Sequence, residues 1–254
     1  MSKIVITGSA SGIGREVAKK LSDSGHEIIS IDLRDADIIA DLSTSEGRQK
    51  AIADTLEKTG SEIDILITAA GMGGHLADGK LVMIVNYFGT VELLDGFFQA
   101  MKGRAGAAAL ALSSNSAQMG VDPENELVKA LLAHDEQAAI DVVGDMPSAA
   151  TYGLSKHAVA RAVRRRAHEW GTAGVRLNAI APGMTETPML QGVRDNPDLK
   201  GALENIPVPL DRTANVDEIA NIIVMMVSEA FSFMHGSVLY VDGGTDAVVR
   251  PDQF

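Results

Sequence analysis

The sequence contains no cysteine, and only 4% of its 254 residues are aromatic. A chain without cysteine has no disulfide, no thiolate nucleophile and no cysteine-ligated metal, which suits a reducing compartment. We find no basic leader followed by a separate apolar stretch and cleavage site, and no uninterrupted apolar run approaches the roughly 18 residues that suggest a membrane span. We therefore expect a cytoplasmic protein without a membrane span, and we assign no metal site.

Basic residues are also scarce: 34 acidic residues face 22 basic ones, for a formal charge of −12. This balance repels phosphate backbones, so we expect no nucleic-acid partner. The basic cluster "RAVRRRAHEW", residues 161–170, is explained as the solvated face of an amphipathic helix. The hydrophobic share of 46% is ordinary for a folded protein, and the length favours one large domain, residues 1–254.

Short apolar runs alternate with longer segments of helical pattern along the chain. Near-continuous apolar runs are typical of strands buried on both faces of a parallel sheet. Their alternation with helices predicts right-handed crossovers. We therefore predict an α/β fold: a single-domain, Rossmann-type, doubly wound parallel sheet with helices on both faces. The expected strands lie in residues 3–8, 26–32, 63–71, 108–114, 175–183 and 236–244, and helices in 14–25, 44–60 and 81–101.

A glycine-rich turn follows the first strand in "IVITGSASGIG", with Gly8, Gly12 and Gly14. Glycines there allow a tight turn and close approach of a ligand, and the following helix offers free N–H groups to a pyrophosphate. The spacing G-x-x-x-G-x-G differs from the general G-x-G-x-x-G pattern and is weak evidence alone. Its position between a strand and a helix strengthens it. A dinucleotide is the ligand that this turn predicts.

Asp32 ends the second strand, 18 residues after Gly14. A carboxylate at this position meets the ribose hydroxyls of a dinucleotide, and its charge opposes a 2′-phosphate. Neither Ser11 nor Leu33 supplies a cation for such a phosphate. We therefore predict NAD as the cofactor rather than NADP, although the nearby cation of Arg34 leaves NADP open. The alternative role for Asp32 is that of a simple turn former, with no contact to a cofactor.

The stretch "YGLSK" places Tyr152 and Lys156 four residues apart, on one face of a helix. A phenol with its ordinary pKa is a poor base near neutral pH, but a neighbouring cation stabilises the phenolate. Tyr152 could then move a proton as a general acid/base. This spacing alone is common in surface helices, so the assignment depends on the other motifs.

Together these motifs resemble the short-chain dehydrogenase/reductase family. The matching segments are "TGSASGIG" in the cofactor turn, "NYFG" at residues 86–89, "LSSNSA" after the fourth strand, "YGLSK" and "APGMTETP", in family order over almost the whole chain. The resemblance implies that Ser114 bonds the substrate oxygen, Tyr152 transfers the proton and Lys156 lowers the pKa of Tyr152 and holds the ribose. Asn86 would position a water that leads to Lys156.

The same resemblance implies a set of cofactor-binding residues. Asp41 and Leu42 look like an adenine-binding pair, and Ile180 and Thr187 would engage the carboxamide. The complete expected set is Gly8, Ser11, Gly12, Ile13, Gly14, Asp32, Asp41, Leu42, Ala70, Gly71, Tyr152, Lys156, Ile180, Thr185 and Thr187.

The chain departs from the family pattern in two places. Where members carry Asn-Asn-Ala-Gly, residues 68–71 read "TAAG", so a polar side chain is missing and backbone contacts from Ala70 and Gly71 must serve. From Ser114 to Tyr152 the chain runs 38 residues, roughly two dozen more than the family needs. We predict one or two helices in this insertion, at about 118–148, covering the site or a surface that relatives use to associate.

Within the insertion, Asp122 is the predicted N-cap and Pro123 the first helical residue, with Leu127, Leu131 and Leu132 as the apolar face. A second helical run is expected over residues 138–143. The segment 184–210 mixes methionines with glycine and proline, and we expect a mobile apolar lid there.

The insertion, the "VNYFG" motif and the C-terminal segment are similar to a bacterial subgroup of the family, the 3α-hydroxysteroid dehydrogenase/carbonyl reductases. This similarity implies reversible, NAD-dependent oxidation of the 3α-hydroxyl of a steroid or bile acid to the 3-ketone. The alternatives are a generic carbonyl or 3-oxoacyl reductase and a non-catalytic NAD-sensing regulator. The expected partners are a hydrophobic alcohol or ketone and further copies of the chain, as a dimer or tetramer.

Overall fold

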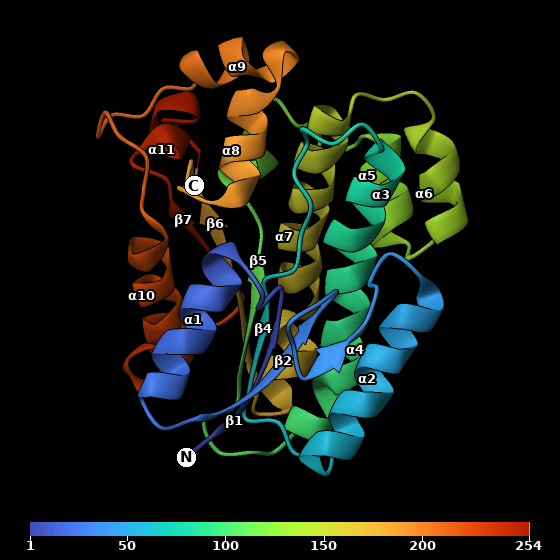
Figure 1. Cartoon of the computed structure of the whole chain (residues 1–254), viewed down its shortest axis with the longest axis vertical. Helices are drawn as coiled ribbons and strands as arrows, with labels where there is room; N and C mark the ends of the chain where they lie inside the picture. Colours follow the sequence, from blue (N-terminus) through green and yellow to red (C-terminus); the bar gives the residue numbers. More distant parts are fainter. Residues whose placement is uncertain (254) are drawn as a thin grey trace.

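Seven parallel strands form one sheet in the computed structural model, which describes residues 1–253 apart from the side chains of Lys200 and Ala202 (Figure 1). The sheet has the order β3-β2-β1-β4-β5-β6-β7, with β1 and β4 adjacent at its centre. This confirms the predicted doubly wound α/β fold; the final residue of the range 1–254, Phe254, lies outside the described residues. The strands are β1 (Lys3–Thr7), β2 (Glu27–Asp32), β3 (Ile38–Ile39), β4 (Ile65–Thr68), β5 (Ala108–Leu112), β6 (Arg176–Pro182) and β7 (Val238–Val241).

Helices cover both faces of this sheet (Figure 1). Helices α1 (Gly12–Asp23) and α10 (Val216–Val227) pack on one face, and α2 (Ser45–Thr59), α4 (Gly89–Met101) and α7 (Ser148–Thr172) lie on the other. Successive strand residues point to opposite faces, so β1 sends Ile4 and Ile6 into one apolar cluster and Val5 into the other. Two cores therefore hold the sheet between its helical layers.

The predicted helix over 81–101 is a continuous helix with a wide turn inside it. It runs through α3 (Gly79–Met83), a π-helical turn η1 (Ile84–Phe88) and α4. By length and composition alone this helix could cross a membrane, but 67% of its most apolar stretch is buried inside the fold. Its apolar residues pack against β4, β5 and α7, which accounts for its hydrophobicity.

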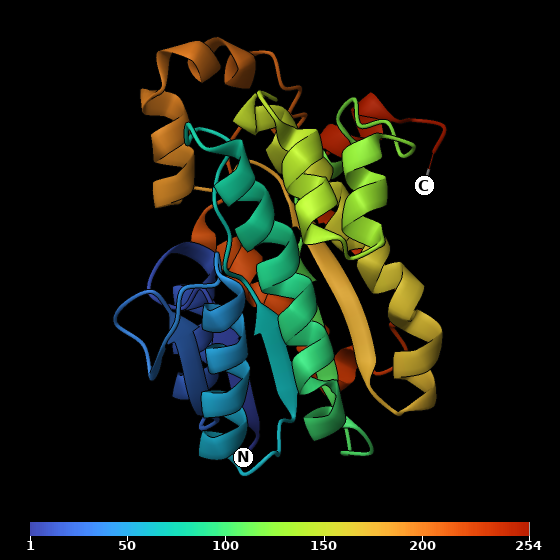
Figure 2. The same cartoon turned by 90° about the vertical axis from the view of Figure 1, so that its right-hand side faces the viewer.

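The insertion forms two short helices, α5 (Glu126–Leu132) and α6 (Glu136–Val143), beside α7 (Figure 2). Leu127 and Leu131 are buried, and Leu132 is partly exposed. The helix starts differ from the prediction: Asn125, not Asp122, accepts the Leu127 N–H as the N-cap of α5. Asp122 instead bonds the Glu124 N–H in the preceding turn, which keeps Pro123 out of the helix.

The basic cluster of α7 is not simply a solvated face. Arg161 donates to the Pro123 carbonyl and Arg165 to the Leu132 carbonyl, so two of its side chains bind the insertion. Arg166 pairs with Asp95 on α4. Arginine donors here satisfy carbonyls that the short insertion segments leave unpaired, including one at the end of α5.

Helices α8 (Pro188–Asp195) and α9 (Pro197–Glu204) stand over the carboxyl edge of the sheet (Figure 1). They occupy part of the segment expected to be a lid. The remaining elements are the short helices η2 (Asn115–Gln118), η3 (Glu229–Phe231) and α11 (Thr245–Val249).

Candidate active site

A cavity of about 600 Å³ opens at the carboxyl edge of the strands. Its size falls in the ~300–1,000 Å³ range of cofactor and small-molecule sites, and its position is the usual one in an open α/β sheet. Most residues predicted for the site meet in this cavity: Gly8, Ser11, Gly12, Ile13, Gly14, Asp32, Asp41, Leu42, Ala70, Gly71, Ser114, Tyr152, Lys156, Thr185 and Thr187 line it. Asn86 and Ile180 do not.

The three glycines of the first turn serve different purposes. A Cβ on Gly8 would come 2.6 Å from the Ala70 nitrogen, and one on Gly14 would come 2.2 Å from the Gly8 oxygen. Both therefore make room for the protein's own backbone. Gly12 has φ +54°, and a Cβ there would have only the Thr187 side chain nearby, at 3.6 Å. Of the three, Gly12 is the one that opens toward a ligand.

Two carboxylates, Asp32 and Asp41, line the end of the cavity beside β2. Asp32 is held in place because it accepts the Ala10 N–H at 2.9 Å and the Leu33 N–H at 2.7 Å. Lys156, at the other end, is the one cationic side chain among the lining residues described. This charge distribution suits ribose hydroxyls and disfavours an extra phosphate at the carboxylate end.

The loop that carries Asp41 and Leu42 is packed tightly against two helices. A Cβ on Gly47 of α2 would come 1.9 Å from the backbone carbonyl oxygen of Asp41. A Cβ on Gly89 of α4 would come 3.2 Å from the Leu42 Cβ. Thr44, the N-cap of α2, accepts the Gly47 N–H at 3.0 Å. The carboxylate end of the cavity is therefore fixed by close backbone contacts.

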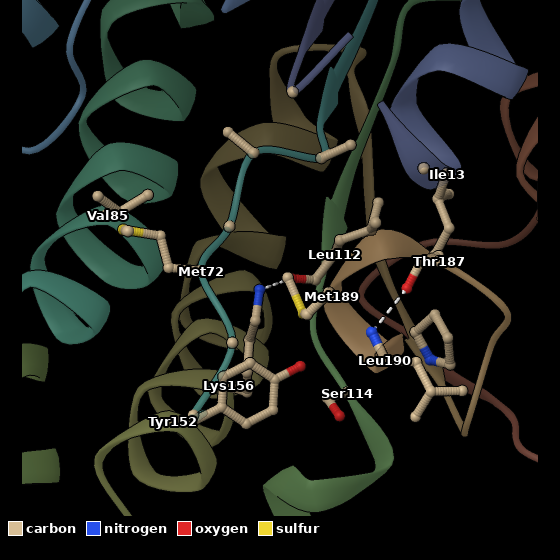
Figure 3. Close-up of a pocket in the computed structure, with 18 of the residues that line it drawn as sticks. Ile13, Met72, Val85, Leu112, Ser114, Tyr152, Lys156, Thr187, Met189 and Leu190 are labelled. Atoms are coloured by element: carbon tan, nitrogen blue, oxygen red, sulfur yellow. Dashed lines mark hydrogen bonds between the residues drawn. The ribbon is translucent and has the colours of Figure 1, made fainter. Parts of the chain in front are cut away.

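Ser114, Tyr152 and Lys156 face one another at the opposite end (Figure 3). Ser114 follows β5, and its Oγ accepts the Ser116 N–H at 3.2 Å and the Ser116 hydroxyl at 2.9 Å. It is thus the cap of η2 and still has its own proton to donate. Lys156 Nζ lies 6.0 Å from the centre of the Tyr152 ring and donates to the Leu112 carbonyl at 2.9 Å.

Burial sets the acid–base properties of this group. Burial raises the pKa of Tyr152, and a hydrogen bond with Ser114 partly opposes that rise. Burial lowers the pKa of Lys156 to about 8, since the residue is 4% exposed and no carboxylate among the described residues opposes the effect. Burial therefore disfavours the charged form of each group, but with a pKa of about 8 Lys156 still carries its charge at neutral pH.

Asn86 lies behind the cavity wall, in the wide turn η1, and is fully buried. Its side chain makes a two-way clasp with Met72: Oδ1 accepts the Met72 N–H at 2.8 Å, and Nδ2 donates to the Met72 carbonyl at 3.0 Å. Nδ2 also lies 3.4 Å from the Ser155 hydroxyl. Asn86 therefore fixes the loop after β4 against α7, and a π-helical turn is a common feature near functional sites.

Thr187, the N-cap of α8, lies on the wall opposite Met72 and Val85 (Figure 3), and Thr185 also lines the cavity. Thr187 Oγ1 accepts the Leu190 N–H at 3.2 Å and donates to the Thr185 carbonyl at 3.2 Å. The assignment of Ile180 needs correction. It is fully buried inside β6, and its carbonyl accepts the Ser113 N–H at 2.8 Å, so its side chain and carbonyl serve the sheet.

The departure "TAAG" leaves a polar atom unpaired. Thr68 Oγ1 is buried with no hydrogen-bond partner among the residues described, whereas the Ala70 N–H donates to Thr7 Oγ1 at 3.0 Å. Gly71 is closely surrounded: a Cβ there would come 3.0 Å from Asn86 Oδ1 and 3.4 Å from Lys156 Nζ, so either side chain would have to shift. The backbone of residues 68–71 therefore packs directly against Asn86 and Lys156 and is tied to β1 by the Ala70–Thr7 hydrogen bond.

Two features of the site were not predicted from the sequence. Ser116 orients Ser114; its spacing of two residues after a strand-end serine is a signal that could have revealed it. The second is the share of the apolar half of the cavity that Met72, Leu81, Val85 and Ala149 contribute from outside the expected lid at 184–210. This half carries no charged side chain among the residues described. It is lined by Met72, Leu81, Val85, Ala149, Met184, Met189, Leu190, Val193, Leu199, Leu203 and Ile206.

Comparison with known proteins identifies relatives along the whole chain. A family model described as short chain dehydrogenase matches residues 2–124, and one described as Enoyl-(Acyl carrier protein) reductase matches residues 137–246. The matches leave out residues 125–136, which contain α5. The chain is 45% identical to a 3-alpha-hydroxysteroid dehydrogenase/carbonyl reductase of Comamonas testosteroni, with 100% of both chains covered.

Two further relatives extend this comparison. The crystal structure of a 3-alpha-hydroxysteroid dehydrogenase from Pseudomonas sp. B-0831, complexed with NADH, has a TM-score of 0.97 at 41% identity over 100% of both chains. A 2,5-dichloro-2,5-cyclohexadiene-1,4-diol dehydrogenase of Sphingobium indicum is 31% identical over 96% of this chain and 97% of its own. The resemblance in the motifs is confirmed: the chain is an oxidoreductase that belongs to the short-chain dehydrogenase/reductase family.

Proposed function

We propose that the protein is an NAD-dependent dehydrogenase that reversibly oxidises the 3α-hydroxyl of a steroid or bile acid to the 3-ketone. The observation that carries this proposal is one cavity with a glycine turn and Asp32 at one end, and Ser114, Tyr152 and Lys156 at the other. The uncharged, methionine-rich half of the cavity suits a large apolar substrate. The names of the relatives at 45% and 41% identity support the same substrate class.

The cavity offers what NAD requires. Gly12 gives the open turn for the pyrophosphate, Asp32 accepts ribose hydroxyls, and Asp41 with Leu42 borders the adenine. When bound, NAD supplies the nicotinamide ring that accepts a hydride. The proposed cofactor-binding set is the predicted one without Ile180.

The residues around the hydroxyl then divide the proton chemistry. The Ser116 groups occupy the acceptor positions of Ser114, so its one proton, which is directed to Tyr152 in the ligand-free protein, would be donated to the alcohol oxygen when substrate binds. In oxidation Tyr152, as the phenolate, would remove the proton of the substrate hydroxyl, and in reduction the phenol would return it, so Tyr152 acts as the general base in one direction and the general acid in the other. Lys156 stabilises the phenolate by its charge, and Asn86 acts indirectly by fixing the loop beside it.

We further propose one catalytic domain with an apolar lid over residues 184–210. Leu190, Leu199 and Leu203 of α8 and α9 line the cavity from above the sheet, so closure over a substrate would exclude water. We also propose that the protein is cytoplasmic and assembles as a dimer or tetramer, which light scattering of the purified chain tests.

The decisive assay measures NADH formation at 340 nm with 3α-, 3β- and 17β-hydroxysteroids beside simple secondary alcohols. We expect the 3α-hydroxysteroid to be oxidised with the highest kcat/KM. Equal activity with all alcohols, or activity with 3-oxoacyl thioesters alone, would identify a generic reductase. NADH binding without turnover of any substrate would identify a nucleotide sensor.

A further inference from the structure

Arg48 of α2 is a fully buried cation that joins three distant parts of the chain. Its Nε donates to Glu92 of α4 at 2.8 Å, and its Nη2 donates to Glu136 of the insertion at 2.5 Å. Its third contact is different in kind: Nη1 donates to the Leu42 carbonyl at 3.3 Å. Leu42 lines the cofactor cavity, so a chain of hydrogen bonds runs from the insertion to the cavity wall.

Two residues of the insertion, His134 and Glu136, lie close to Arg48. Glu136 is the first residue of α6, whose N-terminal end lies close to the start of α2 (Figure 1). His134, in the turn before α6, packs edge-on against Phe88, with ring centres 5.3 Å apart. The Arg48 guanidinium lies 5.8 Å from the centre of the same Phe88 ring. Arg48 is thus fixed by contacts on several sides.

We propose that Glu136 is a positioning residue for the cofactor: through Arg48 it fixes the loop that contains Asp41 and Leu42. The planar guanidinium has its donors in a rigid fork, so holding one nitrogen determines where the others point. Without Glu136 the guanidinium keeps Glu92 but is free to turn, and the Leu42 carbonyl loses a fixed donor. The insertion thereby contributes to NAD affinity from outside the cavity.

Charge alone does not explain this arrangement. The buried Arg48 is already paired with Glu92, whose side chain is 22% exposed, so removal of Glu136 leaves no unpaired buried charge. Removal of Glu136 therefore changes the orientation of the Arg48 guanidinium and not the charge balance. The effect is expected on the loop with Asp41 and Leu42, at the adenine end of the cavity. Ser114, Tyr152 and Lys156 lie at the other end and should be unaffected.

The test measures dissociation constants of NADH and of ADP-ribose, which lacks the nicotinamide, by calorimetry with the full chain. For Glu136→Ala we expect both constants to rise by the same factor, about five- to twentyfold, with kcat at saturating NAD within twofold of wild type. Glu136→Asp keeps the charge but is one methylene too short, so it should weaken binding in the same way. Glu136→Gln keeps an acceptor for Nη2 and should restore most of the affinity.

Asp141→Ala is the matched control, because Asp141 is an exposed acid on the same helix whose side chain, within the described part of the chain, accepts a hydrogen bond only from Gln137. The inference rests on the proposed cofactor. If wild type binds neither ligand, the proposed function fails and this inference fails with it. If wild type binds both and Glu136→Ala and Glu136→Asp bind them equally well, even with a lower melting temperature, the positioning role alone is overturned. A fall in kcat with unchanged dissociation constants would also overturn it.

Discussion

The group that the proposed chemistry depends on most is the Tyr152 hydroxyl. In Tyr152→Phe the ring remains but the proton carrier is lost, so we expect kcat to fall about 10²- to 10⁴-fold while NADH binding is retained. Tyr240→Phe is the matched control, because Tyr240 lies on β7 and does not line the cavity. Near-normal turnover by Tyr152→Phe would remove Tyr152 from the proton transfer.

The buried charge of Lys156 lowers the folding stability of the protein. Burial lowers its pKa from the usual 10.5 to about 8. Below pH 8 both folded and unfolded chains carry the charge, and the folded chain bears the full cost of burying it. Between about pH 8 and 10.5 unfolding takes up a proton, so the cost fades as pH rises.

We therefore expect Lys156→Met to be inactive but more stable than wild type at pH 7, by on the order of 1 to 3 kcal/mol in urea unfolding of the ligand-free protein. The gap should narrow at pH 9.5. Lys19→Met, at an exposed position on α1, should show no such gap. A difference that stays constant with pH would mean that Lys156 is not a buried charge in solution.

Asp32 should decide the choice between cofactors. Asp32→Ala removes the negative charge that opposes a 2′-phosphate, and the kcat/KM ratio of NAD to NADP should fall by about tenfold or more. Asp54→Ala removes an equally negative side chain from the surface of α2 and should leave the ratio unchanged. Unaltered selectivity in Asp32→Ala would rule out its contact with the ribose.

Among the secondary-structure elements, α6 of the insertion offers an internally matched experiment. Val143 is 2% exposed and belongs to the apolar core, whereas its neighbour Val142 is 39% exposed. Val143→Ala should reduce the free energy of unfolding by about 2 kcal/mol, and Val142→Ala by less than about 0.5 kcal/mol. Equal effects would mean that the insertion does not pack on the core in solution.

The element pattern was predictable where local signals were strong. Apolar runs ending in Gly, Ser or Asp located six of the seven strands, but β3 has only two residues and gives no such signal. The wide turn η1 was not predictable, because its sequence "IVNYF" contains no proline or glycine to mark it. The N-cap of α5 is Asn125 and not the predicted Asp122. Asn and Asp cap helices equally well, so the sequence does not distinguish between the two positions.

At the scale of the whole molecule, the motif order predicted which residues meet at the sheet edge. Sequence could not reveal contacts made by the insertion: Arg48 and Glu136 are 88 residues apart, and nothing in either segment signals the other. The error at Ile180 has a related origin. The motif "APG" was assigned correctly to the sheet edge, but the Ile180 side chain is buried in the apolar cluster between the sheet and the helices α1 and α10 and does not line the cavity.

Cofactor binding should stabilise the whole fold, because the cavity joins segments from Gly8 to Ile206. NAD at one hundred times its dissociation constant should add about 2.7 kcal/mol to stability and raise the melting temperature by roughly 5–10 °C. Differential scanning fluorimetry measures this shift. Tyr152→Phe should keep it, whereas NADP at equal concentration should give a smaller one. No shift with NAD would contradict the proposed cofactor.

The close approach of other backbone atoms to Gly8 and Gly14 affects how homologous sequences are interpreted. At both positions a side chain is excluded by the polypeptide itself, at 2.6 and 2.2 Å, whether or not a nucleotide is present. A descendant that had abandoned catalysis would still need both glycines to fold. Gly12 meets no backbone at its Cβ position and faces the cavity, but its φ of +54° also favours glycine, so a replacement there in a homologue would strain the turn as well as narrow the space for the coenzyme.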